Sequence, residues 1–225
     1  MKTVGYIKWL GHAAFEVELD GLRLYFDPWI ENPKSPIKVS DIYKADFVFV
    51  THDHGDHLGN AVEIAEKTGA KIVAIFDLCQ AIKDGGAKVE CIDMNIGGLS
   101  DIGGISVALV PALHSSTHGS PVGFVVKGKE ATIYHAGDTG IFMDMQLIGE
   151  LYKPDIAMLP IGGWYTMGPY EAAHAVKLIK PKAVIPMHYG TFPAIKGSPE
   201  EFKKYIQRIF PVQVVVLEPG QTFEF

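Results

Sequence analysis

The sequence predicts an α/β fold in which two β-sheets pack face to face and helices cover their outer sides. Two observations support this prediction. Strand patterns run in succession at the start and again in the middle of the chain, and each run is followed by alternating strands and helices. That order suggests two packed sheets with outer helices. The 225 residues show no linker, charge run or low-complexity segment, so we expect one domain over residues 1–225.

The first 27 residues have the pattern of strands. Between positions 13 and 19, apolar residues alternate with other residues in the period of two that is typical of a half-buried strand. The Asp-Gly pair that follows predicts a tight turn into a second strand at 22–26. After a proline-rich loop, the apolar run 46–50 has the length of a buried strand.

Strands and helices alternate after this point, with a second run of strands in the middle. Periodicity and turn residues predict the following elements in order: a helix at 61–67, a strand at 71–76, a helix at 77–84, strands at 87–92, 105–110, 123–128 and 131–135, a helix at 141–151, a strand at 155–159, a helix at 169–180, a strand at 183–187, a helix at 199–209 and a strand at 212–217.

Composition limits the partners and the location of the protein. Apolar residues make up 48% and charged residues 20% of the chain, which is typical of a globular protein. The net charge of -6 argues against a broad nucleic-acid surface, because such surfaces need clustered Lys and Arg. No apolar stretch is long enough for a membrane span, and Lys8 interrupts any signal-peptide core. Two cysteines cannot form a disulfide scaffold, so we expect a reducing compartment, the cytoplasm. Cys79 and Cys91 also lack CxxC spacing, so we expect both to be buried free thiols.

The densest chemical signal is the segment THDHGDH, which directly follows the buried strand DFVFV. Residues i and i+2 on extended backbone point to the same side, so His52 and His54 can meet on one cation. Gly55 permits a turn, which directs Asp56 and His57 to a second position. One loop therefore offers ligands to two adjacent metal ions; the alternative is a polar loop with solvated histidines.

Three further polar residues follow apolar strands. His114 comes after the strand at 105–110, Asp138 lies in the turn after the strand at 131–135, and His188 follows the strand at 183–187. Loops held by a rigid sheet commonly carry binding groups. Each residue alone would more often be an ordinary loop residue, but beside the histidine segment each becomes a candidate metal ligand.

These residues together resemble the metallo-β-lactamase-fold hydrolases over essentially the whole chain. The motifs GH at 11–12, YHAGDT at 134–139, LPIGG at 159–163 and PMHYG at 186–190 are similar to a largely uncharacterised family of metal-dependent hydrolases related to ascorbate-6-phosphate lactonase. The resemblance implies a four-layer αββα sandwich of two mixed sheets with a dinuclear site at one edge. It implies this division of ligands: His52, His54 and His114 at site one, Asp56, His57 and His188 at site two, and Asp138 as the bridge.

The implied ligand set indicates the metal and the reaction. Three neutral imidazoles suit zinc best, with nickel, manganese or iron as alternatives, so we expect two divalent ions per chain. A hydroxide held between two cations is a strong nucleophile near neutral pH. Asp56 and Asp138 are the expected catalytic carboxylates. Two carboxylates and one hydroxide leave the site cationic, which favours a small, anionic substrate.

Four more residues are candidates for supporting the ligands or the substrate. The resemblance places Asp27 under the metal loop, as an acceptor for a ligand or an amide. Asp53 lies between two candidate ligands and is either a supporting residue or exposed. The resemblance also places His12 near the pocket, where it would contact the substrate or a ligand; the alternative is a capped turn. His118 either lines the entrance or is a solvated loop residue. Aromatic residues of two neighbouring loops are candidates for an apolar pocket wall or for core packing: Trp164, Tyr165 and Phe192, with Met167.

Three functions remain open on the sequence. The first is hydrolysis of an ester, lactone or amide-like bond of a small molecule. The second is phosphodiesterase or nuclease activity on the same metals, although the acidic balance argues against long nucleic acids. The third is a di-iron redox protein or a noncatalytic metal-binding module; related di-iron redox proteins usually have Glu where this chain has His54. A homo-oligomer is possible.

Overall fold

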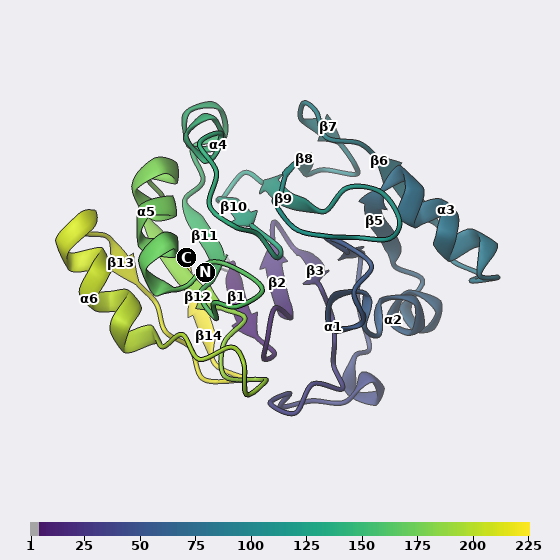
Figure 1. Cartoon of the computed structure of the whole chain (residues 1–225). Helices are drawn as coiled ribbons and strands as arrows, with labels where there is room; N and C mark the ends of the chain where they lie inside the picture. Colours follow the sequence, from purple (N-terminus) through teal and green to yellow (C-terminus); the bar gives the residue numbers. More distant parts are fainter. Residues whose placement is uncertain (1–4) are drawn as a thin grey trace.

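The computed structural model describes residues 5–225, so residues 1–4 of the expected N-terminal strand region lie outside it. Two seven-stranded mixed sheets lie face to face (Figure 1). The first sheet contains, from edge to edge, β14 (Thr222–Glu224), β1 (Tyr6–Trp9), β2 (Phe15–Leu19), β3 (Leu22–Phe26), β4 (Phe47–Phe49), β5 (Lys71–Ile75) and β6 (Cys91–Met94). The second contains β13 (Gln213–Val214), β12 (Ala183–Met187), β11 (Ile156–Pro160), β10 (Thr132–His135), β9 (Val122–Lys127), β8 (Ser106–Pro111) and β7 (Ser100–Asp101).

Each sheet begins antiparallel and continues parallel. Strands β1 to β3 pair antiparallel and β3 to β6 pair parallel. In the second sheet, β7 to β10 pair antiparallel and β10 to β13 pair parallel. Parallel strands need crossover connections, and these supply most of the helices.

The helices cover the outer faces and complete the expected αββα sandwich. They are α1 (Gly55–Leu58), α2 (Ala61–Thr68), α3 (Phe76–Asp84), α4 (Met145–Tyr152), α5 (Pro169–Ile179) and α6 (Pro199–Ile209), with a 3-10 turn at Val39–Asp41. Helices α2 and α3 pack on β4, β5 and β6, whereas α4, α5 and α6 cover the second sheet (Figure 1).

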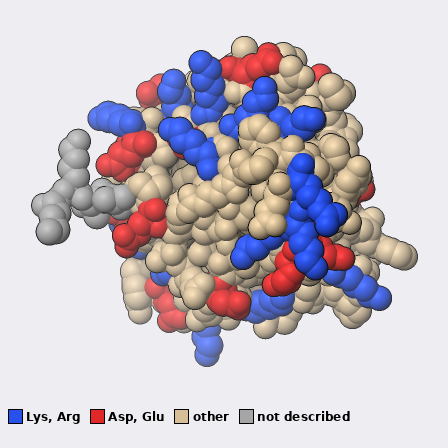
Figure 2. Space-filling view, turned by 90° about the vertical axis from the view of Figure 1, so that its left-hand side faces the viewer, with Lys and Arg blue, Asp and Glu red and all other residues tan. Residues whose placement is uncertain are grey.

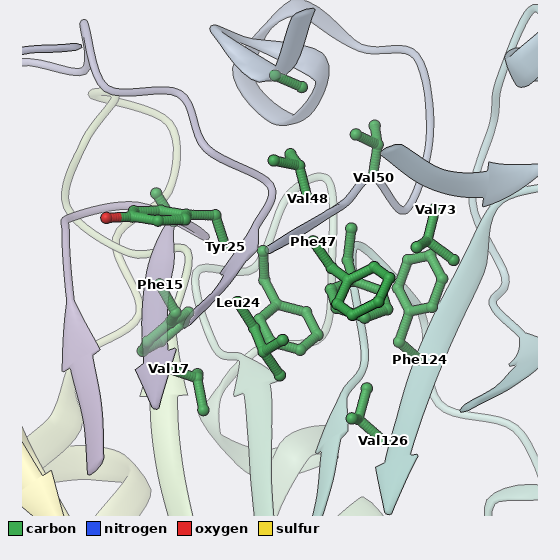
Figure 3. Close-up of a cluster of buried hydrophobic side chains, with 14 of the residues drawn as sticks. Phe15, Val17, Leu24, Tyr25, Phe47, Val48, Val50, Val73, Phe124 and Val126 are labelled. Atoms are coloured by element: carbon green, nitrogen blue, oxygen red, sulfur yellow. The ribbon is translucent and has the colours of Figure 1, made fainter. Parts of the chain in front are cut away.

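The main core lies between the two sheets. Strand β4 is buried along its whole length and alternates its side chains between two apolar layers. Phe49 meets Phe124 of the second sheet with ring centroids 5.1 Å apart. Figure 3 shows Phe47 directed toward that sheet and Val48 directed to the opposite side. Burial on both sides explains why this strand reads as a continuous apolar run and not as an alternation.

The differences from the predicted elements fall at sheet edges and short turns. The strand expected at 87–92 lies at Cys91–Met94, and the one expected at 212–217 shortens to Gln213–Val214. The short elements α1, β7 and β14 had no clear periodicity. Edge strands are defined by one neighbour, as when β14 pairs with β1, so their own sequence specifies them weakly.

The expectation of free thiols was wrong. Cys79 of α3 and Cys91 of β6 form a disulfide, with their Cα atoms 5.9 Å apart. The crossover from β5 through α3 to β6 brings the two residues together, which sequence spacing alone did not reveal. The expected reducing compartment rested on the low number of cysteines, and a disulfide between the two weakens that argument.

The face of the molecule on the α6 side carries charges of both signs (Figure 2). Figure 2 shows Lys and Arg mixed with Asp and Glu over the face on the α6 side, without one continuous basic area. Across residues 5–225, no helix combines the length and the apolar character that a membrane crossing requires.

Candidate metal centre

Strand direction brings the candidate ligands to one edge of the sandwich. In the second sheet, β8, β10 and β12 run the same way, because β8 and β10 are both antiparallel to β9 and β12 follows β10 and β11 in parallel. Their carboxyl ends therefore share an edge. His114, Asp138 and His188 follow these ends, and the histidine segment after β4 meets them there.

The first ligand group consists of three imidazoles. His52 Nε2 lies 3.0 Å from His54 Nδ1, and His114 Nε2 lies 3.3 Å from the same atom. His54 occupies the N-cap of α1 with extended backbone, so its side chain stays on the side of His52 before the helix turns away. These are the three residues that the resemblance implied for site one.

The second group contains one carboxylate and two imidazoles. Asp56 Oδ2 lies 3.9 Å from His57 Nε2 and 3.9 Å from His188 Nε2. Asp56 and His57 project from the first turn of α1, where the sequence predicted only a turn. His12 joins this group, because its Nε2 lies 3.0 Å from Asp56 Oδ2.

Asp138 lies between the two groups. Its Oδ2 is 3.0 Å from His188 Nε2, 3.3 Å from His57 Nε2 and 3.6 Å from His114 Nε2. The preceding Gly137 has a positive φ of 61°, and a Cβ there would lie 2.9 Å from Thr51 Cβ. Glycine is therefore needed for the backbone to come this close.

The donor set fits divalent metal ions. Two ligand nitrogens at about 2.1 Å from one tetrahedral ion are about 3.4 Å apart, which is the range of the separations found here. In each group that could hold an ion, the ligand atoms lie within 4.8 Å of one another. His57 Nε2 and Asp138 Oδ1 are buried and have no hydrogen-bond partner among the described residues. Buried polar atoms are rarely left unpaired, and a bound cation would account for both of these.

In the metal-free chain, the surroundings shift the pKa values of the candidate ligands in different directions. Burial opposes charge on His57, but the carboxylates of Asp138 and Asp27 outweigh it and raise its pKa well above the usual value. Burial would raise the pKa of Asp138, yet His57 and His188 hold it well below its usual value. Burial lowers the pKa of His52 to about 3, assisted by the neighbouring His57, so His52 is neutral as a metal ligand must be.

Asp27 supports the ligands from below, as the resemblance implied. Its side chain is fully buried. Oδ1 accepts from the Thr51 amide at 2.8 Å, while Oδ2 accepts from the Thr51 hydroxyl and lies 2.7 Å from His57 Nδ1. Such a carboxylate fixes the tautomer that leaves His57 Nε2 free to bind a metal.

His12 holds the opposite side of the site. It is fully buried, and burial lowers its pKa to about 4 against the hydrogen bond to Asp56. Its Nδ1 lies 3.0 Å from the Thr191 hydroxyl, and its ring centroid lies 4.0 Å from that of His188. His12 therefore links Asp56 to the loop that follows His188.

Asp53 and His118 form a separate pair beside the site. Asp53 Oδ2 accepts from the His118 amide at 2.9 Å and lies 2.7 Å from His118 Nδ1, while its Oδ1 accepts from the Ser116 hydroxyl. Burial raises the pKa of Asp53, but the hydrogen bonds that its carboxylate accepts outweigh burial and lower this pKa to about 2. The pair fixes the loop that carries His114. His118 is half exposed and is not among the residues lining the metal cavity.

The pocket walls were only partly anticipated. Tyr165 and Phe192 line the cavity, whereas Met167 is buried in the core and Trp164 is 80% exposed. Trp29 also lines the cavity and was missed, because nothing in a proline-rich loop indicates which way its side chain points.

Comparison with known proteins shows which family the chain belongs to. A sequence profile described as "Beta-lactamase superfamily domain" matches residues 22–189, more than half of the chain. The chain belongs to this superfamily. A metal-dependent hydrolase of family UPF0173 from Caldivirga maquilingensis is 59% identical over 221 residues, which cover 97% of each chain. A relative of the same description from Staphylothermus marinus is 59% identical over 226 residues, covering 97% of this chain and 98% of its own.

A solved structure also matches this superfamily member along its length. The metallo hydrolase from the hyperthermophilic archaeon Ignicoccus hospitalis is 44% identical, with a TM-score of 0.93 over 99% of this chain and 100% of that one. The chain is accordingly a metal-dependent hydrolase with the metallo-β-lactamase fold. Its candidate His and Asp ligands are those that meet at the edge of the two sheets.

Proposed function

We propose that this hydrolase cleaves an ester, lactone or amide-like bond of a small molecule with a hydroxide that bridges two divalent metal ions. The observation that carries the proposal is the position of Asp138. Its carboxylate lies within 3.6 Å of imidazole nitrogens from both ligand groups, His114 on one side and His57 and His188 on the other. A carboxylate has two oxygens and can serve two cations at once, which an imidazole cannot.

The chain's own residues would have distinct tasks. His52, His54 and His114 would hold the first ion, and Asp56, His57 and His188 the second. When bound, the two ions would supply a hydroxide nucleophile and polarise the reacting oxygen of the substrate.

Asp56 is the proposed orienting group for the nucleophile. It is the more exposed of the two carboxylates in the site, and it lines the cavity. Its Oδ2 is held by His12, which fixes the direction of the carboxylate. We expect Asp56 to accept a proton or a hydrogen bond from the attacking water, while Asp138 keeps the two ligand groups together.

The nitrogen-rich first group favours zinc, because three imidazoles suit zinc well and calcium or magnesium poorly. Nickel, manganese and iron remain alternatives for the same ligands. Phosphodiester cleavage is less well supported, since no Lys or Arg of the described chain lines the cavity to hold a phosphate.

Metal content and activity test the proposal together. The protein is stripped with a chelator, reloaded with zinc and measured by elemental analysis and on a panel of esters, lactones and phosphodiesters. We expect two zinc equivalents and turnover of carbonyl substrates. His54→Ala should lose mainly the first equivalent and His188→Ala mainly the second, while His174→Ala, on α5 away from the ligand groups, should keep both. Two tightly held ions in His54→Ala and His188→Ala would contradict the ligand assignment.

A further inference from the structure

The cavity over the ligand groups is lined by carboxylates but by no Lys or Arg of the described residues. Its volume is about 840 Å³, and the charged carboxylates that line it, Asp56 and Asp138, are both candidate metal ligands. No Lys or Arg among residues 5–225 lines it. Lys34 lies near the loop after β12 but is engaged elsewhere, since its Nζ donates to the Tyr189 carbonyl at 3.3 Å and lies 5.5 Å from the Tyr189 ring centroid.

This charge distribution suits a neutral substrate. Two divalent ions against two carboxylates and one hydroxide leave about one positive charge, which can stabilise the negative charge that develops on a carbonyl oxygen during attack. A substrate with a phosphate or carboxylate tail would need further cationic partners for that tail. The described lining offers none.

One side of the cavity is an aromatic wall formed by Trp29 and Phe192. Their rings stack with centroids 5.7 Å apart and an interplanar angle of 21°. Each ring lies 5.4 Å from His12, edge to face, and His12 lies 4.0 Å from His188. The wall therefore contacts His12 directly and lies one ring away from the ligand candidate His188, close enough for a single small molecule to contact both the wall and the metal ligands.

The wall is held in place by the same elements that hold the ligands. A Cβ at Gly59 would lie 2.5 Å from Trp29 Cα, so the end of α1 packs directly on the Trp29 backbone. The Asn60 side chain accepts from the Ile30 amide at 2.9 Å. On the other side, the Thr191 hydroxyl next to Phe192 bonds to His12. A wall fixed in this way loses little conformational entropy when a ligand stacks on it.

We propose that the substrate of this hydrolase is uncharged and carries a flat apolar group, such as an aryl ring, that packs on the Trp29–Phe192 wall while its carbonyl faces the metal ligands. This inference rests on the proposed function and narrows its substrate class. It replaces the anionic substrate that the charge of the metals alone suggested.

The test uses zinc-loaded protein and three hydroxamates that anchor to the metals in the same way: acetohydroxamate, benzohydroxamate and 4-carboxybenzohydroxamate. Binding is measured by isothermal titration calorimetry. We expect benzohydroxamate to bind at least about tenfold more tightly than acetohydroxamate, since aromatic packing and burial commonly contribute a factor of that order. The added carboxylate should bring no gain.

Variants assign the difference to the wall. Trp29→Ala should weaken benzohydroxamate about tenfold and leave acetohydroxamate within about twofold, because only the aryl ring reaches the wall. Phe192→Leu removes the stacked partner of Trp29 at a position that is 36% exposed, and it should likewise weaken benzohydroxamate more than acetohydroxamate. Trp164→Ala is the matched control, since this tryptophan is 80% exposed and does not line the cavity. The same three proteins are assayed with phenyl acetate and ethyl acetate.

The outcomes separate the two proposals. If two zinc ions bind and esters are hydrolysed, but benzohydroxamate gains nothing over acetohydroxamate or the carboxylate probe binds most tightly, the neutral aryl substrate is overturned and the hydrolytic centre stands. Equal losses in Trp29→Ala and Trp164→Ala would also overturn it. If the protein holds no zinc and cleaves no ester, the proposed function fails and this inference fails with it.

Discussion

Replacing Asp27 with Asn should weaken metal binding at the second site while leaving the first nearly unchanged. Asp27 touches no candidate ion, so its effect passes through His57, whose Nδ1 lies 2.7 Å from Asp27 Oδ2. An Asn oxygen can still accept from the Thr51 amide, but its NH2 would then face His57 Nδ1. The imidazole could pair with that NH2 only by moving its proton to Nε2, the atom needed for the metal.

The expected size follows from this geometry. Loss of a carboxylate that orients a ligand histidine typically costs 10- to 100-fold in metal affinity. We therefore expect the second zinc to bind about 10- to 100-fold more weakly, equivalent to about 1.4–2.7 kcal/mol. The first zinc should change by less than about threefold, because Asp27 reaches its ligands only through the Thr51 hydroxyl, which lies 3.0 Å from His52 Nδ1.

The assay is a stepwise zinc titration against a competing chelator, which resolves the two affinities. Asp155→Asn is the matched control, because the Asp155 carboxylate accepts from the Thr132 amide and lies near Lys182, away from the ligand groups. An Asp27→Asn protein whose second zinc binds within about twofold of the unaltered protein would refute the role given to Asp27. So would an equal loss at both sites.

Three further predictions concern other parts of the structure. Gly137→Ala should lower the melting temperature and the metal content, because φ is positive there and the added Cβ would lie 2.9 Å from Thr51; thermal unfolding and elemental analysis measure this, and an unchanged pair of values would count against the close approach. In the metal-free protein, burial lowers the pKa of His57, but the carboxylates of Asp138 and Asp27 outweigh burial and raise this pKa well above its usual value, so the stability from this group should be complete below about pH 6.5 and lost as pH rises through the raised pKa. Zinc uptake below the raised pKa should release a proton, which calorimetry detects as a heat that depends on the buffer. The absence of this heat would contradict a protonated His57. Replacing Cys79 and Cys91 together with Ser should cost about 3 kcal/mol of stability in chemical unfolding with little change in activity per folded molecule, whereas unchanged stability would argue against the disulfide.

Contacts between residues that are close in the sequence could be predicted, because local backbone geometry alone sets them. His52 and His54 are two positions apart on backbone that leaves a buried strand, so their convergence needs only strand geometry. Asp138 and His188 required one more assumption, that the strands before them end at the same edge. The parallel order of β10, β11 and β12 meets it.

Contacts that depend on packing between distant segments were not predictable in the same way. Trp29 becomes a pocket wall because α1 ends against its backbone at Gly59, a contact between residues with no shared pattern. The pairing of Cys79 with Cys91 depends on how α3 lies against β6. His12 was expected near the pocket, but its bond to Thr191 depends on a loop from the far end of the chain.

We propose that two ions share Asp138 at the edge of the sheets, and a crystal structure of the zinc-loaded protein with anomalous scattering at the zinc edge tests this most directly. We expect two anomalous peaks about 3.5–4 Å apart, one among His52, His54 and His114 and the other among Asp56, His57 and His188, with Asp138 between them. A single peak at full zinc loading, or two peaks with Asp138 bound to neither, would contradict it.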